Sequence, residues 1–171
     1  CHLGNGSSIS AVKDGKILDT SMGFTPLAGI EMGTRCGDID PAIVPFLMEK
    51  ENLTPAEVDT LMNKKSGFLG LSGISSDCRD LEIAAKEGNE RAALTLEKVC
   101  YQIKQYVASY AAAMGGVDVI LFTGGAGENQ WEVRQGATAG LEFMGVKMDD
   151  EKNKACRATE AVISADDSRV K

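Results

Sequence analysis

The sequence has little of what metal centres, nucleic-acid surfaces and membrane spans require. It holds one histidine in 171 residues, and its five cysteines form no CxxC pair, which disfavours a zinc site. The formal net charge of -7 argues against nucleic acid or an anionic membrane as partner, because either would need a basic face. No apolar run approaches the ~20 residues of a membrane-spanning helix. The N-terminus also lacks the basic and then apolar order of a signal peptide.

The cysteines are odd in number and widely scattered, at Cys1, Cys36, Cys78, Cys100 and Cys156. This pattern is typical of free thiols in a reducing compartment, so we expect a cytoplasmic protein. A chain of this length can bury a real core and suits a single domain. It has no initiator methionine and starts one residue before a dense motif. It stops soon after a strand-like run at 161–164, and we therefore expect a fragment of a longer protein.

Glycine, asparagine and serine crowd the first eight residues, which read CHLGNGSS. The next residues predict a hairpin, with strands at 8–13 and 16–21 joined by the tight turn Asp14-Gly15. Glycines at the mouth of a hairpin let backbone N–H groups approach a ligand closely, and asparagine and serine add side-chain donors. The combination suits an anion, above all phosphate. An ordinary polar turn is the alternative that this stretch alone leaves open.

The middle of the chain alternates predicted helices with glycine-rich loops. Helices are expected at 44–51 and from a Thr54 cap to about Lys65, with Pro55 and Glu57 completing the start signal. A long helix is expected from Asn89 to Met114. Its apolar stripe should pack on the core and consists of Ala93, Leu96, Cys100, Ile103, Val107, Tyr110 and Met114. The loops at 22–41 and 66–80 are too long to be simple connections, which favours a functional role.

A second candidate anion site lies further on. Val117 to Phe122 is a near-continuous apolar run, which predicts a central strand covered on both faces. It leads into the loop TGGAGENQ and a helix from Trp131 to Phe143. A glycine loop at a helix N-terminus favours anions. It is not a Walker A loop, which needs Lys-Ser/Thr after its last glycine, nor a dinucleotide fingerprint, because Gln130 replaces the third glycine.

Four stretches together resemble one known family. They are HLGNGSS, MGFTPLAGIEMGTRCGDIDP, KKSGFLGLSGISSDCRD and LFTGGAGEN, and in this order and spacing they are similar to the acetate kinases. The resemblance covers nearly the whole chain, with propionate and butyrate kinases as near relatives. It implies an α/β fold of the ribonuclease H-like type shared by actin, Hsp70 and the sugar kinases, with a mixed sheet flanked by helices.

The resemblance also implies a function. Acetate kinases transfer the γ-phosphoryl of ATP reversibly to acetate, giving acetyl phosphate and ADP with Mg²⁺. Residues 1–171 would be the C-terminal, ATP-binding domain, truncated at both ends. Its partners would be ATP, acetate, the missing N-terminal domain of the same enzyme and a second copy in a homodimer. The fragment alone should be inactive, because the N-terminal domain carries much of the catalytic machinery.

Site residues follow from the resemblance, position by position. Arg35, in GTRCGD, corresponds to an arginine that steadies the transferring phosphoryl group and the substrate carboxylate. The motifs assign no metal ligand to this chain. The residues implied in nucleotide binding are His2, Leu3, Gly4, Asn5 and Gly6 at the phosphates, Asp77, Cys78 and Arg79 at the adenosine, and Gly125, Ala126, Gly127, Glu128 and Asn129 around the adenine, ribose and α-phosphate.

Two of these roles have simpler structural alternatives. Arg35 could form a salt bridge with Asp38 or Asp40 of its own loop, and Arg79 could pair with Asp77 or with acids further along its segment. The two aspartates of the Arg35 loop also suit a turn and a helix start.

The sequence leaves two questions open, the nucleotide preference and the class of function. Cys78 and Ala126 stand where the family commonly has bulkier apolar residues, so nucleotide preference is open. Propionate or butyrate kinase, another ATPase of the superfamily, and a non-catalytic nucleotide-binding or oligomerisation domain remain as alternative functions.

Overall fold

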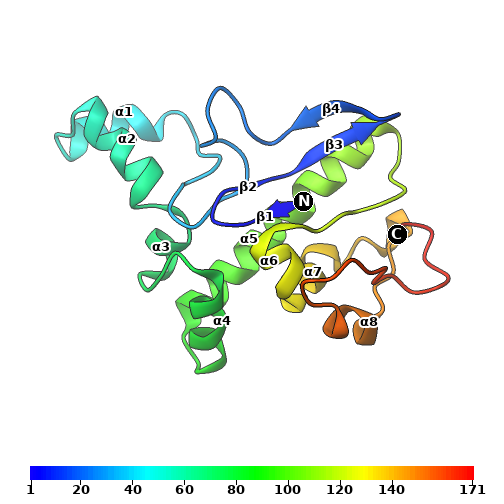
Figure 1. Cartoon of the computed structure of the whole chain (residues 1–171). Helices are drawn as coiled ribbons and strands as arrows, with labels where there is room; N and C mark the ends of the chain where they lie inside the picture. The colour runs from blue at the N-terminus through cyan, green and yellow to red at the C-terminus, as the bar shows by residue number, and fades with distance from the viewer.

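The computed structural model describes all 171 residues, and Figure 1 shows them as a mixed α/β arrangement around one long helix. The elements in chain order are β1 (His2–Leu3), β2 (Ser7–Ser8), β3 (Ser10–Lys13), β4 (Lys16–Thr20), α1 (Ile43–Lys50), α2 (Pro55–Lys64), α3 (Gly67–Ser72), α4 (Cys78–Lys86), α5 (Glu90–Met114), α6 (Gly124–Asn129), α7 (Trp131–Thr138), the 3₁₀ turn η1 (Glu142–Met144) and α8 (Asp150–Ala155). No helix has the length and apolar character needed to cross a membrane.

The N-terminal strands form two antiparallel pairs, β1 with β2 and β3 with β4. At the tip of the second pair, Asp14 and Gly15 both have positive φ, 52° and 72°. Two such residues in succession are the signature of the tight hairpin turn. The predicted hairpin is therefore confirmed, although its first strand is split between β2 and β3.

Helix α5 is the central element, and it crosses behind the other elements in Figure 1. The side chain of Asn89 accepts a hydrogen bond from the Ala92 N–H at its start, and Gly115 ends it in the left-handed conformation. It packs against α3, α4, α7 and β3. The predicted boundaries are correct, but Ala93 is exposed and the buried stripe consists of Ala92, Thr95, Val99, Ile103, Val107, Tyr110 and Ala111.

Several short helices were not predicted. The stretch 66–80, expected to be a loop, contains α3 and the start of α4, and the glycine loop after residue 123 is the helix α6. The helix from Trp131 ends at Thr138 rather than Phe143, and α8 has no sequence signal that we recognised. The first turn of α3 is held by tertiary contacts, because Phe68 N–H and Leu69 N–H donate to the carbonyls of Met32 and Gly33. Such contacts override the low helix propensity of glycine.

The predicted central strand at 117–122 needs a correction. The segment is extended and bonded on both sides, with the Cys1 amino group on the Leu121 carbonyl at 2.8 Å and Ile120 N–H on the Lys171 carbonyl at 2.7 Å, but it is not a regular strand. It is not covered on both faces, since Val119 is 53% and Leu121 68% exposed. Their side chains line an open groove of about 330 Å³ between β3, α5 and this segment. An apolar run predicts a preference for burial, and this face lies open within the 171 residues.

Candidate functional site

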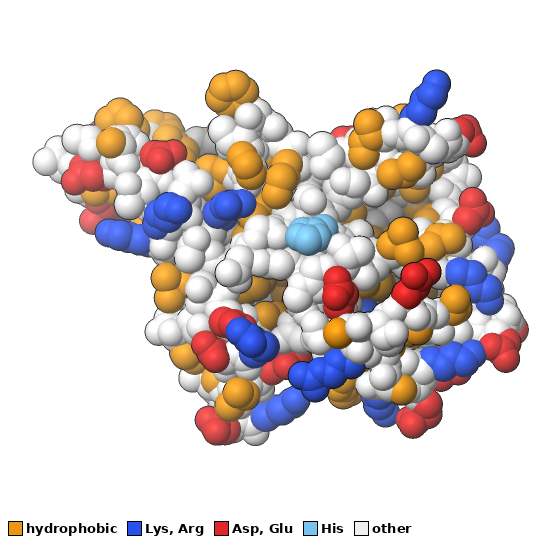
Figure 2. Space-filling model, in the orientation of Figure 1, with side chains coloured by type: hydrophobic (Ala, Val, Ile, Leu, Met, Phe, Trp, Pro, Cys, Tyr) orange, Lys and Arg blue, Asp and Glu red, His pale blue; other side chains and the backbone are white.

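A polar pocket of about 590 Å³ lies where the glycine-rich segments meet. This volume is within the range of about 300–1,000 Å³ typical of small-molecule sites. Figure 2 shows basic and acidic side chains gathered around the lower front of the molecule, over the α4 and α6 to α8 region. The pocket is lined by Gly4, Asn5, Phe68, Ser76, Asp77, Cys78, Arg79, Glu82, Lys86, Gly125, Ala126, Asn129, Gln130, Trp131, Glu132 and Arg157.

The first wall of the pocket is the turn between β1 and β2. Gly4 and Asn5 line the pocket, and the turn is fixed by the Ser7 hydroxyl, which donates to the Gly4 carbonyl at 2.9 Å. The next residue, Gly6, does not line the pocket but faces Arg35. A Cβ on Gly6 would lie 3.3 Å from Arg35 Nη1. The absence of a side chain therefore lets the arginine approach the backbone of this turn.

His2 and Leu3 precede this turn and bond to Thr123, just before α6. Leu3 is a buried core residue, and its N–H pairs with the Thr123 carbonyl. His2 Nδ1 lies 3.0 Å from the Thr123 hydroxyl oxygen and does not line the polar pocket. The structure thus places both residues as the connection between the first turn and the α6 segment.

The second wall is α6 with the residues that follow it. Gly124 has a φ of 79°, and a Cβ there would lie 2.8 Å from the Leu3 carbonyl oxygen, so this position requires glycine. Gly125, Ala126 and Asn129 line the pocket. Gly127 is buried instead, with its carbonyl accepting from Arg134 at 2.9 Å.

Glu128 also turns away from the pocket. Its carboxylate accepts from the Gly124 N–H at 3.1 Å, so it closes its own loop, and its backbone carbonyl accepts from the Ala158 N–H at 3.2 Å. This second bond ties α6 to the segment that carries Arg157. Of the five α6 residues assigned by resemblance, three therefore reach the pocket and two stabilise its wall.

The third wall is the N-terminal end of α4. Asp77 caps this helix by accepting from the Arg79 N–H at 2.9 Å, and its carboxylate also pairs with the Arg79 guanidinium at 2.5 Å. The Arg79 guanidinium holds the pKa of Asp77 below its usual range. The simpler alternative for Arg79, a pair with Asp77, is therefore confirmed, and both residues still line the pocket.

Cys78 lines this pocket as a neutral thiol. Burial raises the pKa of Cys78 to about 12, and the neighbouring Glu82 adds to the shift. A thiol with such a pKa stays protonated at neutral pH and acts as a small apolar group rather than as a nucleophile.

Arg35 stands beside the pocket, against Gly6, and is half-buried. Its Nη1 donates to the Pro26 carbonyl at 3.2 Å, whereas Nε and Nη2 have no partner within the chain. The alternative salt bridge is wrong: Arg35 takes part in no ion pair. Asp38 accepts from the Gly29 N–H at 2.8 Å and Asp40 from the Ala42 N–H at 2.9 Å, so both aspartates stabilise turns.

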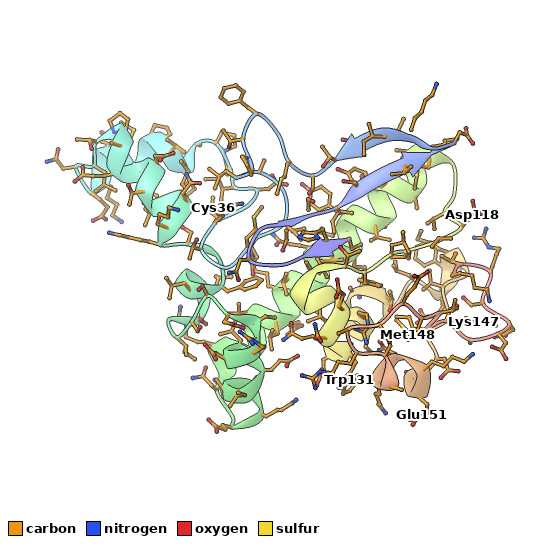
Figure 3. All side chains as sticks on the ribbon, in the orientation of Figure 1. Cys36, Asp118, Trp131, Lys147, Met148 and Glu151 are labelled. Carbon is orange, nitrogen blue, oxygen red and sulfur yellow. The ribbon has the colours of Figure 1, made fainter.

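The sequence reasoning missed several residues of the pocket. Most of them flank the motifs and could have been found from that position alone. Trp131 begins α7 and lies next to α8 (Figure 3), with the Lys154 ammonium 5.5 Å from its ring centre. Lys86 and Glu132 form an ion pair of 3.0 Å between α4 and α7. Arg157 comes from a distant segment with no motif, and nothing in the sequence pointed to it.

The carboxylates around the pocket do not build a metal site. No group of three or more His, Cys, Asp and Glu side chains in the chain is arranged to hold a metal ion.

Glycine-rich turns meet at one polar pocket that also holds three cationic and three acidic side chains. Backbone N–H groups of such turns suit phosphorylated ligands, so the arrangement defines an α/β domain for a ligand of this class. The model of the Acetokinase family matches residues 1–171. The chain therefore belongs to the Acetokinase family.

The relatives agree with this assignment. The chain is 62% identical over 170 residues to a protein named acetate kinase from Phocaeicola vulgatus, and 58% identical over 171 residues to one from Methanosarcina thermophila. These alignments cover 99% and 100% of this chain and 42% of each relative. The chain thus spans less than half the length of the curated relatives that it matches.

Solved structures give the same result. The crystal structure of Porphyromonas gingivalis acetate kinase is 54% identical, with a TM-score of 0.97 over 99% of this chain and 42% of that one. The crystal structure of a propionate kinase from Francisella tularensis is 39% identical, with a TM-score of 0.91 over 98% of this chain and 43% of that one. The α/β fold is therefore confirmed.

Proposed function

We propose that residues 1–171 are the C-terminal, nucleotide-holding domain of a kinase that transfers the γ-phosphoryl of ATP reversibly to acetate, giving acetyl phosphate and ADP. The observation that carries the proposal is the meeting of three separate segments at one place. The Gly4-Asn5 turn, the start of α4 and α6 line one pocket, and Arg35 stands at its edge with two free nitrogen donors. The overall arrangement belongs, on this proposal, to the ribonuclease H-like superfamily of actin and Hsp70.

In phosphoryl transfer, the three pocket segments would bind the nucleotide and Arg35 would supply positive charge. Transfer of a phosphoryl group needs alignment of the reacting oxygens and positive charge around the three equatorial oxygens, and little covalent help. The Gly4-Asn5 turn would hold the phosphates through backbone N–H groups, while α4 and α6 would enclose the nucleoside. Arg35, with its planar fork of donors, would contact both the phosphoryl group and the carboxylate of the acceptor, and it stays charged at any working pH.

The carboxylates of this chain do not fit a Mg²⁺ ion held by protein ligands alone, because no suitable cluster of acidic side chains exists. Magnesium commonly binds through substrate phosphates and one or two carboxylates. We propose that the nucleotide is bound as its magnesium complex.

The acceptor is proposed as acetate, with propionate or butyrate as the alternative. Acetate is favoured by the relatives named acetate kinase at 57–62% identity, whereas the structure named as a propionate kinase is 39% identical. Steady-state rates with the three acids would identify the preferred acceptor. A higher kcat/KM for propionate or butyrate than for acetate would show that acetate is not the preferred acceptor.

We also propose a cytoplasmic homodimer. All five cysteines are free thiols, as a reducing compartment allows. Exposed apolar side chains cover the β3–β4 hairpin and the extended segment next to it, and they include Val12, Ile17, Leu18, Val119 and Leu121. An apolar surface of this kind favours a partner protein. A monomer in sedimentation at high micromolar concentration would contradict the dimer.

The binding half of the proposal is tested by titrating the 171-residue chain with magnesium–ADP in a calorimeter. We expect saturable but weak binding, and at least a tenfold loss of affinity in Gly124→Ala, because an added Cβ would meet the Leu3 carbonyl and displace α6. Thermal melts should show that the variant remains folded. Absence of saturable binding would favour a non-catalytic domain.

The 171-residue chain alone should make no acetyl phosphate from acetate and ATP, because water screens the charges of an open site. An activity within tenfold of that of a complete acetate kinase would overturn this prediction.

A further inference from the structure

The loop that carries Arg35 is attached to the central helix by polar side chains that no motif includes. The loop runs from Gly29 to Asp38. Helix α5 faces it with Lys98, Gln102 and Tyr106, which are spaced four residues apart and therefore lie on one side of the helix. Each of the three contacts the loop through a hydrogen bond.

Two of these contacts meet at Glu31, near the start of the loop. Gln102 Oε1 accepts from the Glu31 N–H at 3.0 Å, and the Lys98 ammonium pairs with the Glu31 carboxylate. Glu31 is only 1% exposed. Burial raises the pKa of Glu31, and Lys98 counteracts part of that shift by favouring the charged form. A carboxylate in such a position is stable only with its cation, so the pair fixes this end of the loop to α5.

The third contact holds the other end. The Tyr106 hydroxyl donates to Asp38 Oδ2, and Asp38 Oδ1 accepts from the Gly29 N–H at 2.8 Å. The Asp38 N–H in turn donates to the Gly29 carbonyl at 2.8 Å. Asp38 thus closes the loop on itself and also connects it to the helix.

Arg35 lies between these two attachments, and its side chain makes no hydrogen bond with α5. Its position depends on the backbone of the loop, in which the Met32 N–H donates to the Arg35 carbonyl at 3.1 Å and the Gly33 N–H to the Asn5 carbonyl at 3.4 Å. Helix α5 also packs on α4 and α7, which form walls of the pocket. One rigid helix therefore sets the position of the arginine loop and of the pocket together.

We propose that Lys98, Gln102 and Tyr106 are positioning residues that hold the Arg35 loop in register with the nucleotide pocket. The inference rests on the proposed function, since it concerns the reaction in which Arg35 would act. Displacing a group by about 1 Å from its productive geometry can cost about 10²-fold in rate. The expected loss is therefore in turnover and not in nucleotide binding.

The test is the double variant Tyr106→Phe with Gln102→Leu, which leaves the Glu31–Lys98 pair intact, in the complete kinase that contains this chain. We expect kcat for acetyl phosphate formation to fall tenfold or more while the KM for magnesium–ATP changes less than twofold. Tyr106→Phe alone should lower kcat about threefold and serves as the variant if the double one does not fold. Tyr101→Phe is the matched control, since Tyr101 is on α5 and its hydroxyl accepts from Gln105, away from the loop.

Hydrogen exchange on the 171-residue chain gives a second readout that needs no activity. Amides of residues 29–38 should exchange at least tenfold faster in the double variant, whereas those of α4 should be unchanged. Unchanged exchange in the loop, or a parallel rise in the KM for nucleotide, would overturn the positioning role. If the complete kinase makes no acetyl phosphate, the proposed function fails, and the exchange measurement alone decides whether α5 holds the loop.

Discussion

Replacing Arg35 with alanine in the complete protein is expected, on the proposed function, to lower turnover by about 10²–10³-fold, the usual effect of losing one group that stabilises a developing charge. Arg35 stands beside Gly6 at the edge of the pocket, and its Nε and Nη2 have no partner in the chain. Since it does not line the pocket itself, the affinity for magnesium–ADP should change less than threefold. The measurements are kcat for acetyl phosphate formation and a calorimetric Kd for the nucleotide.

Two further variants make this experiment specific. Arg35→Lys keeps the charge but loses the planar fork, so it should recover only a small part of the activity. Arg91→Ala is the matched control, because Arg91 lies on α5 and donates only to the Leu71 carbonyl. A loss of nucleotide affinity equal to the loss of turnover would show that Arg35 only supports the fold of the pocket.

Local signals in the sequence predicted the elements that depend on local interactions. Asp14-Gly15 gave the hairpin turn, Thr54 with Glu57 forms the complete capping box, and Asn89 begins α5. In each case the residues that define the structure are within a few positions of one another. The hydrogen bonds of a cap or a tight turn are present in the local chain and need no tertiary partner.

The elements that were missed depend on distant contacts. Helix α3 begins with a glycine at a φ of 60°, where a Cβ would clash with the Met32 carbonyl, and its first N–H groups bond to residues more than thirty positions away. The extended segment at 117–122 was expected to be covered because it is apolar. Its Val119 and Leu121 side chains lie open because no residue of this chain covers that face.

The residues of the candidate site also fall into two groups, those with a local sequence signal and those that depend on distant contacts. Gly4, Asn5, Asp77, Cys78, Arg79, Gly125, Ala126 and Asn129 were all assigned from the sequence and all line the pocket. The ion pair of Arg79 with Asp77 follows from their spacing at a helix start. Arg157 and the contacts of α5 with the Arg35 loop join segments far apart in the chain, and a sequence read by itself has no signal for such pairs.

The other large effect is expected at Arg134, which is only 1% exposed and has no carboxylate partner. Its guanidinium donates to Asn153 Oδ1 at 2.7 Å, to the Asn153 carbonyl at 2.7 Å, to the Cys156 carbonyl at 2.9 Å and to the Gly127 carbonyl at 2.9 Å. One side chain thus joins α6, α7 and α8 and the segment after α8. Burial lowers the pKa of Arg134, which reflects the cost of removing this cation from water.

Arg134→Met should lower the free energy of unfolding by about 3–5 kcal/mol, because buried acceptors left without a donor cost about 1–3 kcal/mol each and the relief from burying a cation offsets part of that cost. Methionine fills much of the same space, so the loss would come mainly from four acceptors left without this donor, three of them in buried hydrogen bonds, rather than from a cavity. Urea unfolding of the 171-residue chain measures it. Arg157→Met is the matched control, with an expected change below about 0.5 kcal/mol, because Arg157 is exposed and makes no hydrogen bond within the chain.

The same substitution should also weaken nucleotide binding, because the Gly127 carbonyl is one of the four acceptors and Gly127 lies in α6, between pocket residues Ala126 and Asn129. Under conditions where Arg134→Met is still folded, the Kd for magnesium–ADP should rise about tenfold. An unfolding free energy within 1 kcal/mol of the parent would mean that the relief from burying a cation offsets the lost hydrogen bonds. A large loss of stability with unchanged affinity would show instead that α6 keeps its shape through the Gly124–Leu3 contact alone.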